Sequence, residues 1–149
     1  MLIVEYLSKS YYRFLNDMPQ YAEHKNRFLI TLNGAKPNEL AAVNNDISEI
    51  TDKIVRVSTA IKDKQSQSNI ASLFSEVRNS RDILLFDKAD LVFAKRTAVK
   101  NPHEQDTSFD INNFFKSIAK HNGVVMLALE NKETLSASMS SKVDVLIRF

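Results

Sequence analysis

The residues of this chain that are best suited to chemistry follow an apolar run at residues 83–86. All four residues of that run are apolar, and Asp87 and Lys88 come directly after them. A buried parallel strand with this pattern presents its terminal carboxylate at the carboxyl edge of the sheet, where ligands and magnesium ions bind. Asp87 is therefore a candidate ligand for Mg²⁺, provided that the metal is retained. The alternative is structural, with Asp87 capping a neighbouring helix or pairing with Lys88.

Gly34 follows an apolar run at residues 28–32, which predicts a buried strand and then a turn. Loops that bind phosphate do so through backbone N–H groups that wrap the phosphate. Such loops need several glycines, and this chain of 149 residues contains only two. Pro37 removes a further N–H donor. The composition therefore almost excludes a glycine-rich phosphate loop.

Composition excludes several other kinds of site. The chain has no cysteine, which excludes disulfides and thiolate chemistry, and its three histidines are too far apart to form a zinc site. The net charge is only +2 and no basic run is present, which argues against a nucleic-acid partner. No segment reaches the roughly 18 apolar residues that a membrane span needs. Glu5 is atypical of a secretory signal, so we expect a cytoplasmic protein.

The elements that would position these candidates alternate along the chain. Strand-like apolar runs occur at residues 28–32, 54–58, 83–86, 124–129 and 143–149, and helical periodicity occurs at 39–46, 66–79 and 109–121. Several of the strands are apolar on both faces, which is typical of a parallel sheet covered by helices on each side. We therefore predict an α/β fold with a five-stranded, mostly parallel sheet flanked by helices on both faces.

The N-terminal segment, residues 1–22, is distinct in pattern from the core at residues 23–149, although the whole chain is expected to form one domain. Apolar residues between positions 2 and 18 recur at spacings of three, four and seven, which predicts an amphipathic helix that ends near Pro19. We expect its apolar stripe to pack on the core. Because all four tyrosines of the chain lie in this region, a partner-binding helix is the alternative.

The stretch from Ile83 to Thr97 carries a family resemblance. It reads ILLFDKADLVFAKRT, and it resembles the Walker B region of the AAA+ ATPases, whose usual form is close to LLFDEADALFGKRT. By this resemblance, residues 28–34 match the strand before the phosphate loop, 124–129 the sensor 1 strand and 143–149 the last strand of the core. The resemblance covers all but the N-terminal helix and implies a P-loop NTPase fold.

Four positions that the resemblance links to catalysis are altered, and three of them lie at the nucleotide edge. Glu39 and Leu40 stand about where the phosphate loop needs lysine and threonine. Lys88 replaces the glutamate that polarises the attacking water in the family. Glu130 aligns with the sensor 1 asparagine, although Asn131 follows one place later.

The fourth altered position lies before the last strand, where Lys142 aligns with the arginine-finger segment. Lysine lacks the bidentate fork of arginine. In the family, the region of Lys95 and Arg96 faces a neighbouring subunit, so these residues and Lys142 are candidate interface residues. A solvated turn is the alternative for Lys95 and Arg96. The family's helical lid would follow the last strand, and we expect no lid in this chain because the sequence ends there.

Alteration at four separate sites implies that the chemistry has been lost while the fold is kept. The resemblance therefore implies a catalytically inactive AAA+-like structural or interaction protein that is not an enzyme and uses no cofactor. Its partners would be other copies of the chain or an active AAA+ subunit, and family association suggests a phage-like or contractile-injection assembly. The alternative is a weak nucleotide-binding protein in which Gly34, Lys36, Asp87 and Lys88 hold ADP or ATP as a structural or regulatory ligand.

Overall fold

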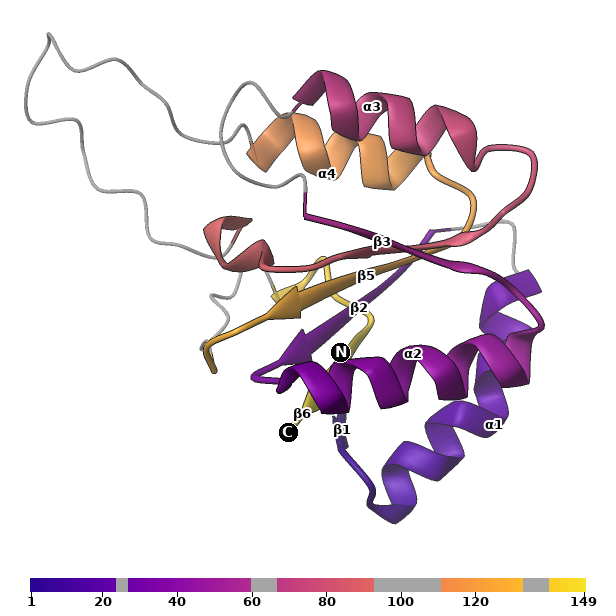
Figure 1. The fold of residues 1–149 in the computed structure, drawn as a ribbon, viewed down its shortest axis with the longest axis vertical. Helices are drawn as coiled ribbons and strands as arrows, with labels where there is room; N and C mark the ends of the chain where they lie inside the picture. Colours follow the sequence, from indigo (N-terminus) through magenta and orange to yellow (C-terminus); the bar gives the residue numbers. More distant parts are fainter. Residues whose placement is uncertain (24–26, 60–66, 93–110, 133–139) are drawn as a thin grey trace, which may run out of the picture.

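Strands and helices alternate along the chain in the computed structural model, which describes residues 1–23, 27–59, 67–92, 111–132 and 140–149 (Figure 1). The strands are β1 (Leu2–Glu5), β2 (Phe28–Asn33), β3 (Val55–Ser58), β4 (Ile83–Phe86), β5 (Val124–Leu129) and β6 (Val145–Arg148). The helices are α1 (Lys9–Glu23), α2 (Pro37–Thr51), α3 (Gln67–Glu76) and α4 (Ile111–Lys120), with a short 3-10 helix, η2 (Ala89–Val92).

The strands form one sheet in the order β1-β6-β2-β5-β4-β3, and every neighbouring pair runs parallel. The predicted α/β fold with a parallel sheet is therefore confirmed. The described residues contain six strands where we predicted five. The additional strand is β1, which lies at the edge of the sheet and pairs with β6, so that Leu2 faces Val145 and Glu5 faces Arg148.

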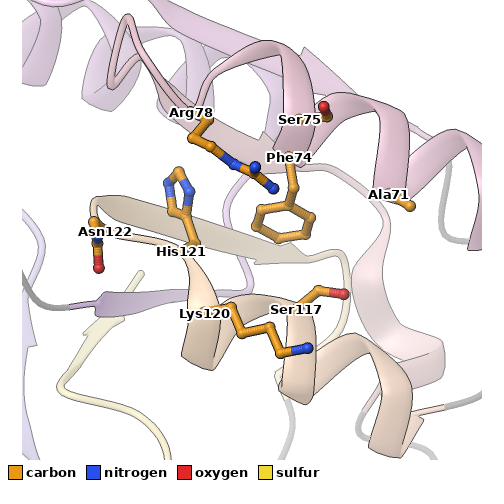
Figure 2. A pocket seen from close by; sticks show the side chains of 8 residues that line it. All are labelled: Ala71, Phe74, Ser75, Arg78, Ser117, Lys120, His121 and Asn122. Atoms are coloured by element: carbon orange, nitrogen blue, oxygen red, sulfur yellow. The ribbon is translucent and has the colours of Figure 1, made fainter.

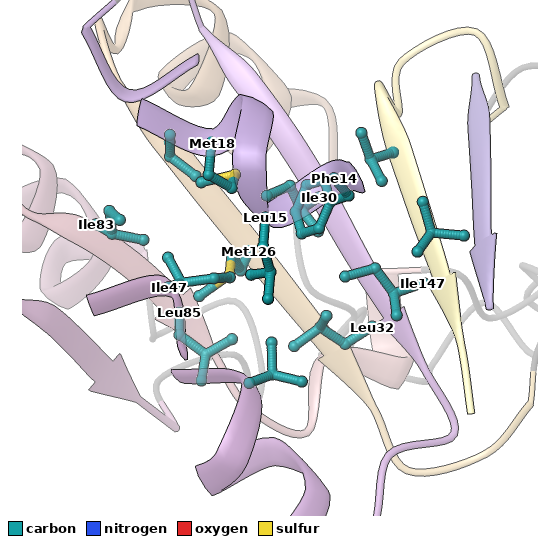
Figure 3. Packing of buried hydrophobic residues seen from close by; sticks show 14 of the residues in the cluster. Phe14, Leu15, Met18, Ile30, Leu32, Ile47, Ile83, Leu85, Met126 and Ile147 are labelled. Atoms are coloured by element: carbon teal, nitrogen blue, oxygen red, sulfur yellow. The ribbon is translucent and has the colours of Figure 1, made fainter. Parts of the chain in front are cut away.

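Helices cover both faces of the sheet, with α1 and α2 on one side and α3 and α4 on the other (Figure 1). Neighbouring residues of β2 point to opposite layers, as the pleat of a strand requires. Ile30 packs in the cluster that contains the buried side chains of α1 and α2 (Figure 3), whereas Leu29 packs with those of α3 and α4. Because the central strands are buried on both faces, their sequences are continuously apolar.

The prediction of a helix over residues 2–18 is wrong for its first part. Residues 2–5 form β1, because the N–H of Leu2 donates to the carbonyl of Asp144 at 2.9 Å and the N–H of Tyr6 donates to that of Arg148 at 2.9 Å. Leu7 then adopts a left-handed φ of 62°, which separates the strand from α1. The N-terminal residues are thus part of the same sheet as the core.

Pro19 lies inside α1 and does not end it. A proline within a helix removes one backbone hydrogen bond and costs about 3 kcal/mol. The helix nevertheless continues to Glu23, because Met18 and Ala22 on either side of the proline are buried in the core. Burial of apolar side chains, at about 25 cal/mol per Å², offsets that penalty.

A polar contact within the core joins the two helices on one face. The hydroxyl of Tyr11 in α1 donates to Oδ2 of Asp46 in α2 at 2.8 Å, while the Tyr11 ring is fully buried. Burial, followed by the hydrogen bond to Asp46, raises the pKa of Tyr11 well above its ordinary value. The phenol therefore keeps its proton and remains the donor in this contact.

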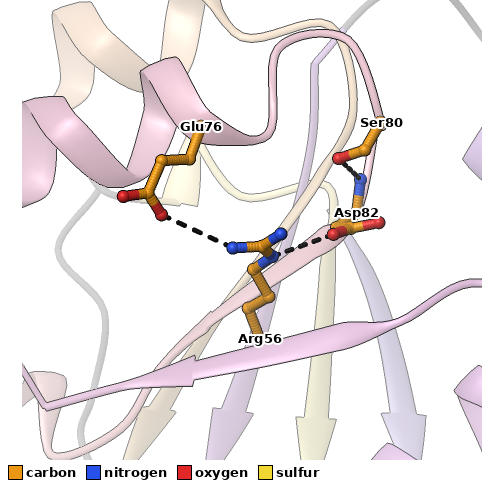
Figure 4. Close-up of polar contacts among 4 residues, drawn as sticks. All are labelled: Arg56, Glu76, Ser80 and Asp82. Carbon is orange, nitrogen blue, oxygen red and sulfur yellow. Dashed lines mark hydrogen bonds and ion pairs between the residues drawn. The ribbon is translucent and has the colours of Figure 1, made fainter.

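Strand β3 is the other edge of the sheet, and ion pairs link it to the end of α3 and to the residue before β4 (Figure 4). Nε of Arg56 donates to Oδ2 of Asp82 at 2.8 Å, and its Nη1 donates to Oε2 of Glu76 at 3.4 Å. The N–H of Asp82 donates to Oγ of Ser80 at 3.4 Å. Arg56 therefore binds two carboxylates, that of Glu76 at the end of α3 and that of Asp82 just before β4.

Candidate functional site

A pocket of about 470 Å³ lies at the carboxyl edge of the sheet, where the sequence predicted a nucleotide site. It brings together all four predicted binding residues, which come from the loop after β2 and the end of β4, and it adds Glu130 from the end of β5. The lining residues are Gly34, Ala35, Lys36, Pro37, Leu40, Ala41, Asn44, Asp87, Lys88 and Glu130. The structure thus brings Gly34, Lys36, Asp87 and Lys88 together at one edge of the sheet.

The connection between β2 and α2 is too short to wrap a phosphate group. A phosphate loop of the GxxxxGK[ST] type needs six residues from its first to its second glycine, whereas only residues 34–36 separate β2 from α2. Gly34 has a left-handed φ of 83°, which glycine adopts without strain. A Cβ at this position would lie 2.6 Å from Cγ of Lys132, so the space above Gly34 is filled by the chain's own lysine.

The N-terminus of α2 is capped by a carboxylate of the same helix. The backbone N–H of Lys36 donates to Oε1 of Glu39 at 2.9 Å, and Pro37 at the first helical turn has no N–H to offer. A helix N-terminus attracts anions through its free N–H groups and its dipole. Glu39 supplies that negative charge from within the chain, at the place where a phosphate would bind in an intact loop.

Asp87 and Lys88 form a tight local turn. Oδ1 of Asp87 accepts the N–H of Lys88 at 2.8 Å, and the N–H of Asp87 donates to the carbonyl of Ser58 at 2.8 Å. Lys88 is exposed and has a left-handed φ of 54°. Among the described residues, no three histidine or carboxylate side chains gather closely enough to hold a metal ion. Asp87 thus contacts the backbone N–H of Lys88, and no ion pair between the two side chains is found among the described residues.

Asp90, which sequence reasoning did not single out as a site residue, joins two of the loops that build the pocket. Its Oδ1 accepts the N–H of Glu130 at 3.0 Å and its Oδ2 accepts the N–H of Asn131 at 3.1 Å. The carboxylate therefore fixes the end of β5 against the turn after β4. The signal that could have revealed it is a second acid three residues after Asp87, at the start of η2.

We expect Asp90→Ala to lower the free energy of unfolding by about 1–2 kcal/mol, because two backbone N–H groups lose a charged acceptor. Asp87→Asn is the matched control, since an amide oxygen can still accept the N–H of Lys88, and its effect should stay within about 0.5 kcal/mol. Urea denaturation of both variants measures the difference. A loss for Asp90→Ala within about 0.5 kcal/mol would mean that the bridge made by Asp90 adds no measurable stability.

Of the three predicted interface residues the structure describes only Lys142, which does not line the pocket. Lys142 precedes β6 and therefore lies at the amino edge of the parallel sheet, opposite the pocket. Its Nζ lies 4.5 Å from the centroid of the Phe115 ring in α4, and its carbonyl accepts Nη1 of Arg27 at 2.9 Å. Lys95 and Arg96 lie outside the described residues.

No protein-family model matches the sequence, and no curated protein matches it either. Solved structures do resemble the fold. A chain of the HORMA:CdnC:Trip13 complex of E. coli MS115-1 superposes with a TM-score of 0.59 at 14% identity, over 92% of this chain and 59% of that one. The Thermotoga maritima RuvB Holliday junction branch migration motor superposes with a TM-score of 0.54 at 13% identity, over 91% of this chain and 41% of that one.

The chain thus spans less than two thirds of the length of either matched chain. At 13–14% identity the similarity concerns the fold alone. Among the described helices, none combines the length and the apolar character needed to cross a membrane. The order of the elements, the parallel sheet and these superpositions together show that the chain has an α/β fold with a parallel sheet, similar to the folds of these two proteins.

Proposed function

We propose that the chain is a catalytically inactive AAA+-like interaction protein that serves as a subunit or adaptor in a larger assembly. The observation that carries this proposal is the self-capped N-terminus of α2, where Glu39 accepts the N–H of Lys36 at 2.9 Å. A nucleotide triphosphate would have to displace this carboxylate or lie beside it. Like charges a few ångströms apart repel by several kcal/mol in a partly desolvated loop.

Other features of the pocket support the loss of hydrolysis. Phosphoryl transfer needs a phosphate cradle, a metal ion and a group that orients the attacking nucleophile. The cradle is reduced to residues 34–36, and Lys132 fills the space above Gly34. Lys88, at the position of the expected glutamate, carries a positive charge and cannot take a proton from water while it is protonated.

The fold can persist without this chemistry, because its stability comes from the apolar strands and helices and not from the site. The exposed apolar side chains on the edge strand β1, among them Leu2 at 49% and Ile3 at 45% exposure, support a role in binding other proteins. The E. coli chain of similar fold was solved in a complex with other proteins. We extend that analogy to this chain, with a second copy or an active AAA+ subunit as partner and a phage-like or contractile-injection assembly as one possible setting.

Calorimetric titration with ATP and magnesium tests the proposal, with the oligomeric mass measured by light scattering before and after. We expect no saturable heat and no change in mass. The variant Lys88→Glu restores the carboxylate next to Asp87, yet it should also show no ATP hydrolysis, because the loop of residues 34–36 is unchanged. Turnover by this variant would contradict the proposal that the site is disabled at several points.

The alternative function is weak nucleotide binding, and one observation favours it. Asn44 lines the pocket, and its buried Oδ1 has no hydrogen-bond partner, so it could accept a hydrogen bond from a ligand. Lys36 and Lys88 would supply positive charge nearby. Saturable heat in the same titration, lost in Asn44→Ala, would favour this function over a pure adaptor.

A further inference from the structure

A second pocket, of about 270 Å³, lies between α3 and α4 at the amino edge of the sheet (Figure 2). Its residues come from the C-terminal parts of both helices and the turns after them, which lead into β4 and β5. The lining residues are Ala71, Phe74, Ser75, Arg78, Ser117, Lys120, His121 and Asn122. Because it sits at the opposite edge from Gly34 and Asp87, this pocket is independent of the proposed function.

The described side chains that line this pocket include two cations and no anion. Figure 2 shows Arg78 and Lys120 on facing walls with the Phe74 ring between them. None of its described lining residues is acidic, and neither cation has a hydrogen bond or ion pair within the described chain. Glu76, the acid nearest to Arg78 in sequence, is engaged by Arg56 at 3.4 Å.

The partial negative charges of the helix C-termini offset only part of the positive charge of Arg78 and Lys120. A helix C-terminus carries about half a negative charge, so the ends of α3 and α4 together supply about one against the two full positive charges of Arg78 and Lys120. Arg81 adds to the positive field, since burial and then the Arg81 charge lower the pKa of His121 below its ordinary value. His121 itself is 7% exposed, and its Nε2 has no hydrogen-bond partner.

The pocket also offers neutral groups that suit a small organic anion. Ser75 contributes a hydroxyl group and Asn122 an amide, whereas the hydroxyl of Ser117 already donates to the carbonyl of Asn113 at 3.2 Å. Phe74 lies edge-on to His121, with ring centroids 5.3 Å apart, and gives the pocket an aromatic wall. An anionic group between two cations, with an apolar body on an aromatic wall, is the chemistry that these residues complement.

We propose that this pocket binds a small molecule through an oxyanion, a phosphate or a carboxylate, which pairs with the exposed cations Arg78 and Lys120, with the apolar part of the molecule against Phe74. The guanidinium of Arg78 can donate two parallel hydrogen bonds to either anion. A phosphate and a carboxylate both suit this pairing, and they differ in the number of oxygens that they present to the surrounding donors.

Titration of the full chain with phenyl phosphate and with benzoate tests the proposal, with benzyl alcohol as the uncharged analogue. NMR follows the backbone amides of the pocket and the ring signals of His121. We expect at least one anion to bind saturably and to shift these signals, and benzyl alcohol to bind at least tenfold more weakly. Tighter binding of phenyl phosphate would assign the site to phosphate, and tighter binding of benzoate would assign it to carboxylate.

Two variants of exposed residues, Arg78→Gln and Lys120→Gln, should each weaken anion binding by about tenfold or more, since each removes a charged hydrogen-bond donor. Lys116→Gln is the matched control, because Lys116 is exposed on the same helix one turn earlier and does not line the pocket. The proposal is overturned if neither anion binds saturably, if benzyl alcohol binds equally well, or if Lys116→Gln weakens binding as much as the other two variants.

Discussion

A chain that lacks residues 1–23 is expected to be unfolded or insoluble. Those residues form β1 and α1, and α1 buries the side chains of Tyr11, Phe14, Leu15, Met18 and Ala22. Full burial of one large apolar side chain contributes about 1.5–3 kcal/mol, so the lost contacts together approach the whole stability of a typical domain, about 5–15 kcal/mol. Circular dichroism and the soluble yield of the truncated chain measure the outcome. A truncated chain with a cooperative melt near that of the full chain would contradict the expectation.

A single substitution gives a graded form of the same test. Phe14 is 1% exposed and packs in the core, so Phe14→Ala should lower the free energy of unfolding by about 3–5 kcal/mol. Arg13→Ala is the matched control, because Arg13 is the adjacent residue in α1 and is exposed. Its effect should stay within about 0.5 kcal/mol. Similar losses in both variants would mean that α1 acts through helix formation and not through its buried face.

The second large effect is expected on the opposite face of the sheet. Phe86 is fully buried at the end of β4, and its ring centroid lies 5.3 Å from that of Phe114 and 5.9 Å from that of Phe74. Phe86→Ala should therefore lower the free energy of unfolding by about 3–5 kcal/mol, because it opens a cavity beside the rings of Phe74 and Phe114. Denaturant titration monitored by circular dichroism measures the loss.

The control for Phe86 lies on the neighbouring strand. Val57 in β3 is 56% exposed, so Val57→Ala should change stability by no more than about 0.5 kcal/mol. Phe86→Leu keeps most of the apolar volume and should fall between the two. A loss for Phe86→Ala no larger than that for Val57→Ala would mean that the core under α3 and α4 is loosely packed.

The central strands could be predicted from sequence because burial on both faces leaves a plain signature. Residues 83–86 and 124–129 are continuously apolar, and each forms a strand with every residue buried. The turn at Gly34 was also predictable, since Asn-Gly after an apolar run is typical of a turn and the glycine has a φ of 83°. These are local signals that do not depend on the rest of the chain.

The N-terminal strand could not be predicted in the same way. Val4 is buried by the tertiary fold, but its neighbours are exposed on an edge strand, so β1 shows no alternation, and its short apolar run at residues 1–4 fits a helix as well as a strand. Its apolar residues also extend the periodicity of α1, which made one long helix the natural interpretation. Only pairing with β6, far away in sequence, decides the conformation of residues 2–5.

The candidate site was predictable in its members but not in its contacts. The motif placed Asp87 and Gly34 at one edge of the sheet, and the structure brings them into one pocket. That Glu39 caps the helix and that Lys132 fills the space above Gly34 depends on side-chain positions that no motif describes. The positive pocket between α3 and α4 left no sequence signal, because Arg78 and Lys120 are far apart in the chain and each is an ordinary surface residue when considered alone.

The pairing of β1 with β6 also determines when the edge of the sheet can form during synthesis of the chain. Glu5 and Arg148, which form an ion pair across these two strands, are 143 residues apart in sequence. During synthesis, residues 2–5 leave the ribosome first and can find their partner strand only after residues 145–148 have emerged. Contacts over such a separation close slowly, because the entropy of a long loop is lost before any pairing energy is gained. Until then the outer edge of β6 is open, and a strand from another chain could pair with it in place of β1.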